Sequence, residues 1–234
     1  EVAWLYPESH AENFPNFGVE PGAYESEISV ALRRAGLSYD RVSRGALTAS
    51  TSAEGALRVG ATSFQVVVVE GVRAADPAML EAIERAVEAG VPVIWMGEFP
   101  ERAIGLVDAQ ARDAEVRSRV ENLRSLVVLV SSVEEIPATI SNAGVTPSLR
   151  PADATGLQAS VQHRRVTDGH LYFLFNESYA QITDRVRIEG ASREVLLLDP
   201  ETGEPVTANL EGDVLTVTLP GARGVVLWIA AAPD

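Results

Sequence analysis

Apolar and polar positions follow two different periods along the chain. From residue 1 to about residue 150, short apolar runs alternate with stretches whose apolar side chains recur every three or four positions. This alternation is typical of a parallel sheet whose two faces are covered by helices. We therefore expect strands at 2–5, 37–42, 64–69, 91–95 and 126–130.

The connections between these strands carry helix signals. Asp76 and Pro77 suit the N-cap and first turn of a helix, and Gly90 lies where that helix should end. Residues 108–124 form a charged segment with a narrow apolar stripe, as expected of a surface helix. These patterns predict a flavodoxin-like or class I amidotransferase-like parallel α/β layered domain over residues 1–147.

The second half of the chain has the period of antiparallel strands. A proline-containing linker at 146–155 precedes seven short apolar runs separated by glycine and aspartate turn signals. Within 213–219, larger apolar side chains occupy every second position, as in a strand with one buried face. We predict a small antiparallel β-sandwich over residues 156–234. Its expected strands are 161–166, 170–175, 182–188, 193–198, 205–209, 213–219 and 223–230.

Composition narrows the classes of function. The 33 acidic and 19 basic residues give a net charge of −14, which disfavours nucleic acid and anionic membranes as partners. We find no apolar run of about 18 residues that would span a bilayer. All 19 basic residues are arginine, which indicates a GC-rich bacterial genome. The chain starts directly in a strand without methionine, so we expect a piece of a longer protein.

Two motifs in the second half carry a family resemblance. The strand Tyr172-Phe-Leu-Phe-Asn176 precedes the turn Asp199-Pro-Glu-Thr-Gly203-Glu204. Together they resemble the C-terminal sandwich of glycoside hydrolase family 106, the α-L-rhamnosidases. The first half is similar to the α/β module that comes before that sandwich, with 39–42, 66–69 and 90–94 in the same order. Family 42 β-galactosidases have a related arrangement, in which an amidotransferase-like domain supports trimer formation.

The resemblance implies a non-catalytic accessory region of a larger glycoside hydrolase. In that family the catalytic carboxylates and the bound calcium belong to an upstream barrel, so no catalytic residue, metal ion or cofactor is expected here. The implied partner is the upstream catalytic domain of the same polypeptide, and a homo-oligomer through the α/β domain is a further expectation. Class I amidotransferase activity is excluded, because the chain has no cysteine to supply a thiolate nucleophile. The compartment stays open between secreted and cytoplasmic.

Three glutamates are candidate ligand-binding residues. Glu8, Glu70 and Glu98 follow the first, third and fourth predicted strands, and open α/β sheets bind ligands beyond the carboxyl ends of their strands. Glu70 and Glu98 would end neighbouring strands about 4.8 Å apart. Glycosidases use carboxyl pairs about 5–9.5 Å apart as acid and base. The second interpretation is that both side chains cap helices or face water.

Two aromatic residues complete the candidate list. Phe14 and Phe17 lie in a loop at 7–22 that contains proline and glycine, where exposed rings would suit a carbohydrate-binding module. They would suit contact with an upstream domain equally well. Three hypotheses thus remain: an accessory scaffold, a carbohydrate-binding module, and a self-contained hydrolase that uses Glu70 and Glu98.

The histidines and a sequon have simpler interpretations. His163 and His170 flank a predicted hairpin turn and are expected to face each other as a cross-strand contact rather than as a metal site. Asn176 begins a formal glycosylation sequon, which we interpret as a strand end where the amide bonds to the turning backbone.

Overall fold

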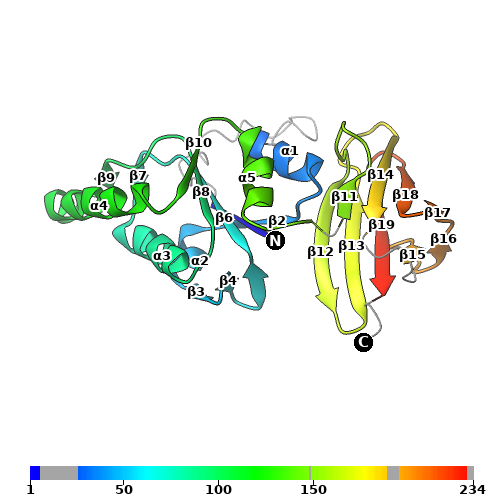
Figure 1. The fold of residues 1–234 in the computed structure, drawn as a ribbon, viewed down its shortest axis with the longest axis horizontal. Helices are drawn as coiled ribbons and strands as arrows, with labels where there is room; N and C mark the ends of the chain where they lie inside the picture. The colour runs from blue at the N-terminus through cyan, green and yellow to red at the C-terminus, as the bar shows by residue number, and fades with distance from the viewer. Residues whose placement is uncertain (6–25, 148, 189–194, 231–234) are drawn as a thin grey trace. The chain divides into compact units, whose positions relative to one another are not determined.

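A computed structural model describes residues 1–5, 26–147, 149–188 and 195–230 (Figure 1). By its contacts the chain divides into two compact units. The first contains β1 (Val2–Leu5) and residues Tyr39–Val145, and the second contains α1 (Glu27–Arg34) and residues from Thr146 onward. Helix α1 thus precedes most of the first unit in sequence but belongs to the second.

The first unit is built on a five-stranded parallel sheet. Its strands are β1, β2 (Tyr39–Val42), β6 (Val66–Glu70), β8 (Val93–Met96) and β10 (Val128–Val130). They lie in the order β10-β8-β6-β1-β2, with every neighbouring pair parallel. Counted along the chain this is the order 2-1-3-4-5, which is found in flavodoxin-like sheets. The predicted parallel α/β region is therefore confirmed.

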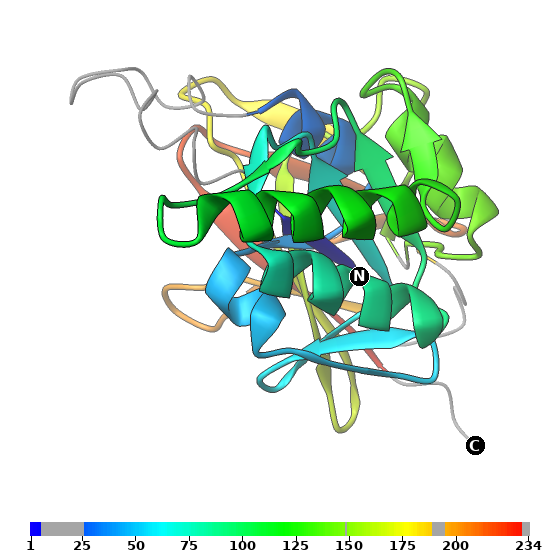
Figure 2. The same ribbon diagram turned by 90° about the vertical axis from the view of Figure 1, so that its left-hand side faces the viewer.

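Helices cover this sheet. They are α2 (Arg44–Thr48), α3 (Pro77–Glu88), α4 (Ala109–Arg124) and α5 (Glu135–Asn142). Figure 2 shows α3 and α4 side by side across one face, while α5 contacts β8 and β10. The predicted cap at Asp76 is present, because its Oδ1 accepts a hydrogen bond from the Ala78 amide at 3.1 Å. None of the described helices is long and apolar enough to cross a membrane.

A small meander interrupts one predicted strand. It consists of β3 (Thr51–Ala53), β4 (Ala56–Val59) and β5 (Thr62–Phe64). The single strand expected at 64–69 was wrong at its start, because Phe64 ends β5 and β6 begins only at Val66. Gln65, between them, donates its amide to the Glu1 carbonyl at 2.9 Å. A second short pair joins β7 (Ala74–Ala75) to β9 (Arg102–Ala103).

The second unit contains two antiparallel sheets. One has the order β11 (Leu149–Pro151), β14 (Ile182–Ile188), β18 (Val214–Leu219) and β17 (Asn209–Glu211). The other has the order β12 (Ser160–Val166), β13 (Gly169–Phe175), β19 (Gly224–Ala230), β15 (Val195–Leu198) and β16 (Pro205–Val206). The antiparallel character predicted for this half is confirmed. The run at 205–209 splits into β16 and β17, and the segment expected as a linker contributes β11.

The two antiparallel sheets share one core. Alternate side chains of β13, β19 and β15 meet alternate side chains of β14 and β18, so each sheet has an inner and an outer face. Tyr172 and Leu174 of β13 and Leu215 of β18 are among its most deeply buried members.

Candidate functional site

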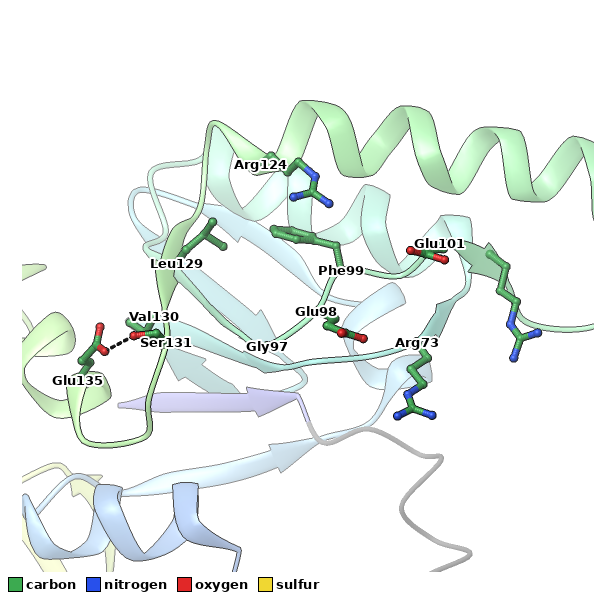
Figure 3. A pocket seen from close by; sticks show the side chains of 11 residues that line it. Arg73, Gly97, Glu98, Phe99, Glu101, Arg124, Leu129, Val130, Ser131 and Glu135 are labelled. Carbon is green, nitrogen blue, oxygen red and sulfur yellow. Dashed lines mark hydrogen bonds between the residues drawn. The ribbon is translucent and has the colours of Figure 1, made fainter.

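A cavity of about 820 Å³ lies at the carboxyl ends of β8 and β10 (Figure 3). Open parallel sheets place ligands at this edge, beyond the strand ends. Its lining comes from the loops after β6 and β8, from β9, from the end of α4, and from β10 with the start of α5. These residues are Arg73, Gly97, Glu98, Phe99, Glu101, Arg102, Arg124, Leu129, Val130, Ser131 and Glu135.

Two of the lining residues, Phe99 and Arg124, belong to a stack of three side chains. The ring of Trp95, fully buried at the end of β8, stacks on Phe99 with centroids 4.4 Å apart and an interplanar angle of 17°. The guanidinium carbon of Arg124 lies 4.6 Å from the Phe99 ring centroid, as a cation–π contact. Trp95 Nε1 also donates to the Glu98 carbonyl at 3.3 Å, which holds the loop after β8 against its own strand.

Two glycines allow the loops after β6 and β8 to touch. Gly97 adopts φ +89°, a conformation that side chains rarely tolerate. A Cβ on Gly71 would lie 3.0 Å from both the Glu98 amide nitrogen and the Met96 carbonyl oxygen. The close approach of these backbones therefore depends on the absence of a side chain at both positions.

The charges around the cavity are balanced. Three arginines and three glutamates line it, and Ser131 Oγ donates to Glu135 at 2.6 Å. Figure 3 shows the guanidinium groups of Arg73 and Arg124 far apart rather than converging on one point. Such a lining suits an uncharged ligand with many hydroxyl groups better than an anion, because no group of like charges gathers there.

Of the two predicted glutamates that the structure describes, one lines this cavity. Glu98 is exposed and lines it, whereas Glu70 ends β6 with its Oε2 buried and is absent from the lining. Glu8, Phe14 and Phe17 lie outside the described residues. The remaining lining residues, among them Arg73, Phe99 and Arg124, were not predicted as site residues.

A second cavity, of about 810 Å³, lies within the second unit. A polar clamp holds its wall in place. Arg33 Nη1 donates to the carbonyls of Leu157 and Gln158, at 3.2 and 2.6 Å. The buried carboxylate of Asp184 accepts the amides of Gln158 and Ala159, the latter at 2.7 Å. This clamp ties α1 and β14 to the segment that leads into β12, so its role is structural.

Asn176 also lines this second cavity and is a structural centre. Its side chain is 1% exposed, and Nδ2 donates to the carbonyls of Ala180, Leu219 and Pro220. Its Oδ1 accepts from both the amide and the hydroxyl of Ser178. The interpretation as an asparagine that bonds to turning backbone is confirmed, and a side chain so buried and so bonded is a poor glycosylation acceptor.

The two histidines face each other as expected. His163 Nε2 and His170 Nδ1 are 2.8 Å apart, and the His163 ring stacks on Tyr172 with centroids at 4.6 Å. Burial, followed by the charge of His170, lowers the pKa of His163 from 6.5 to about 4. Within the described part of the chain, no three His, Asp or Glu side chains gather in a way that would hold a metal ion.

Comparison with known proteins gives a consistent result. The profile of the α-L-rhamnosidase family, glycoside hydrolase family 106, matches residues 26–210. The structure of a rhamnosidase from Novosphingobium sp. PP1Y matches 100% of this chain, with a TM-score of 0.68 and 23% identity, and this covers 23% of that protein. A search of curated proteins finds no match.

Two further glycoside hydrolases have the same fold over this region. An apo exo-carrageenase of family GH42 from Bacteroides ovatus matches 99% of this chain and 29% of its own length, with a TM-score of 0.57 and 13% identity. A β-galactosidase from Bacillus circulans sp. alkalophilus matches 98% of this chain and 41% of its own length, with a TM-score of 0.54 and 14% identity. This chain therefore spans less than half the length of each of these proteins.

Proposed function

Because this chain belongs to glycoside hydrolase family 106, the α-L-rhamnosidases, we propose that it is a non-catalytic accessory region of a larger enzyme of that family. The parallel unit would act as an amidotransferase-like scaffold, and the antiparallel unit, as a β-sandwich, would cap the catalytic domain of the same polypeptide. The parent enzyme would hydrolyse a terminal rhamnosyl or similar glycosidic bond.

One observation carries this proposal. All of the chain matches the solved rhamnosidase, yet that match accounts for only 23% of the rhamnosidase. A self-sufficient enzyme of this family would need the chemistry that the other three quarters can supply, including a pair of catalytic carboxyl groups. A region that supports a catalytic domain needs only a folded core, and each unit has one.

The placement of the candidate carboxylates agrees with a supporting role. Acid and base in a glycosidase must face one substrate from opposite sides of the scissile bond. Glu98 faces the cavity beyond β8, while the Oε2 atom of Glu70 is buried at the end of β6. A self-contained hydrolase would require Glu70 to turn outward into the same space.

A turnover assay separates these hypotheses. We expect the folded 234-residue chain to leave nitrophenyl α-L-rhamnoside and a panel of other nitrophenyl glycosides intact, and the longer polypeptide to cleave one of them. The matched variants are Glu98→Gln and, as control, Glu88→Gln at the end of α3. Turnover by the short chain that is lost in Glu98→Gln but kept in Glu88→Gln would overturn the proposal and identify a self-contained hydrolase.

The cavity favours carbohydrate binding as a second candidate function. Its balanced arginines and glutamates, beside Phe99 and Leu129, offer hydrogen bonds and apolar contacts to a sugar. Calorimetry with rhamnose and rhamnose-containing oligosaccharides tests this. A binding signal that disappears in Arg124→Ala and persists in Arg85→Ala, an exposed arginine on α3, would support a carbohydrate-binding module.

A further inference from the structure

The two antiparallel sheets differ in the chemistry of their outer faces. In β14 and β18 most outward positions are polar, including Thr183, Arg185 and Thr218, while the inward positions other than Asp184 are aliphatic. Such strands have the alternation expected of a sheet with one solvated face. Strands β13, β19 and β15 have no such alternation, because they are apolar at outward positions as well.

The strand register assembles these outward residues into two adjacent rows. Leu171 pairs with Trp228, and Trp228 pairs with Leu196. One step along, Phe173 pairs with Val226, and Val226 pairs with Leu198. We call these six residues the outer apolar face: Leu171, Phe173, Leu196, Leu198, Val226 and Trp228. The three strands that carry them lie side by side in the sheet (Figure 1).

The second unit itself leaves this surface partly exposed, and none of its six residues is fully buried. Phe173 and Leu196, one in each row, are both 38% exposed. The Phe173 ring lies across the neighbouring strand, since a Cβ on Gly224 would be 2.7 Å from its Cε2 atom. The ring also lies 5.9 Å from that of Phe175, at an interplanar angle of 22°.

The residue types indicate what kind of molecule would cover it. Sugars need several precisely placed polar groups beside an aromatic ring, and the side chains of the two rows offer only the indole N–H of Trp228. Strands that are apolar on both faces are typical of sheets covered on both faces by protein. Lasting interfaces also resemble a domain core cut in half, with aliphatic and aromatic side chains at their centre.

We propose that the outer apolar face docks the remainder of the same polypeptide, through a folded domain that presents an uncharged, apolar surface. This rests on the proposed function, in which the chain is one region of a longer enzyme. The solved rhamnosidase has about three quarters of its length outside the matching region, enough for a large covering domain. A second copy of this chain is a weaker occupant, because each copy carries a net charge of −14 and the two would repel.

Cysteine labelling tests the docking directly, because these 234 residues contain no cysteine and any cysteine elsewhere in the longer polypeptide can first be replaced by serine. Leu196→Cys places a thiol on the outer apolar face, and Phe173→Cys provides a second probe. Thr218→Cys is the matched control on the exposed outer face of the other sheet. Each variant is made in the 234-residue chain and in the longer polypeptide, checked for folding by circular dichroism, and reacted with a maleimide.

We expect all three thiols to react rapidly in the 234-residue chain. In the longer polypeptide, the thiols at 196 and 173 should react at least about tenfold more slowly, while that at 218 keeps its rate. Equal rates at 196 in both proteins would overturn the proposal, as would a gene that encodes nothing beyond these residues. The proposal would also be overturned if the thiols at 196 and 173 reacted slowly in the short chain and faster on dilution, because that result would show that the face binds a second copy. Turnover by the short chain would refute the proposed function without changing these rates, so the two failures can be told apart.

Discussion

Strand β6 of the first unit and strand β13 of the second are both rich in large apolar residues, but the chain covers them differently. Val66 to Val69 of β6 are at most 1% exposed, so both faces of that strand are buried. In β13, Tyr172 and Leu174 are at most 2% exposed, whereas Phe173 between them is 38% exposed. Both strands are apolar at successive positions, but β6 is covered by protein on both faces and β13 is fully covered on its inner face alone.

The difference follows from how each kind of sheet is connected. Parallel strands need crossover connections, and here α3, in the connection from β6 to β8, packs on β8, while α4, in the next connection, packs on α3. Antiparallel strands are joined by short turns that bring no covering layer, so each sheet in the second unit covers only the other's inner face. A strand of the second unit that is apolar on both faces therefore indicates that protein from outside this unit covers its outer face.

The largest expected effect contrasts neighbouring residues of β13. Leu174→Ala should lower the free energy of unfolding by about 2–5 kcal/mol, because it leaves a cavity in the shared core. Phe173→Ala removes more atoms but should lower it by only about 1 kcal/mol in the 234-residue chain, because the ring already meets solvent. Urea denaturation measures both values. If Phe173→Ala and Leu174→Ala lowered the free energy of unfolding equally, the outer apolar face would already be covered in the 234-residue chain.

The second largest effect is expected for Asn176, whose side-chain amide lies just after β13. Asn176→Ala removes hydrogen bonds to three carbonyls, those of Leu219 at the end of β18 in the other sheet, of Pro220 after it, and of Ala180. We expect a loss of about 2–3 kcal/mol, because buried carbonyls are left without their donor. The control is Asn209→Ala, an exposed asparagine in β17, which should change stability by less than about 0.5 kcal/mol. A similar loss for both variants would show that the buried amide does not join the sheets.

Strands with strong apolar runs were predictable because their burial is encoded locally. The bounds of β13 and β14 lie within one residue of those expected from the sequence. The break between β5 and β6 was not predictable, because the backbone of Gln65 bonds to Glu1, far away in sequence. Strand β11 was missed because Pro151 suggested a linker. Proline is tolerated there since β11 is an edge strand with one paired side.

The candidate site was predictable only where it follows strand ends. Glu98 was found because residues just beyond parallel strands line the carboxyl edge of the sheet. Arg124 was not, since it ends a helix and reaches the cavity only through its packing on Phe99. The sequence therefore indicated the edge of the sheet but not the set of side chains around the cavity.

A smaller effect concerns the end of the inner face, where His163 packs on Tyr172. The folded chain keeps His163 neutral down to a pKa of about 4, while the unfolded chain takes up a proton near 6.5. Stability should therefore fall as the pH drops from about 6.5 to about 4 and change no further below that, because the unfolded state then binds more protons. Since the ring is only partly buried, we expect a loss of about 1–2 kcal/mol after allowance for solvent screening.

Denaturation at several pH values measures this loss of stability. His163→Gln should remove this part of the pH dependence, and an unchanged profile in that variant would assign the dependence to other groups.

The smallest expected effect lies on the polar outer face of the other sheet. Thr218 Oγ1 and Thr183 Oγ1 form a cross-strand hydrogen bond of 3.1 Å in contact with solvent. Thr218→Ala should change the free energy of unfolding by less than about 1 kcal/mol, in the short chain and in the longer polypeptide alike, because water replaces the lost partner. Phe173→Ala should differ in this respect, with a larger loss in the longer polypeptide than in the short chain. The contrary result would be that Thr218→Ala lowers the free energy of unfolding more in the longer polypeptide than in the short chain. That result would mean that the outer faces of both sheets are covered. The polar alternation of β14 and β18 would then not indicate a solvated surface.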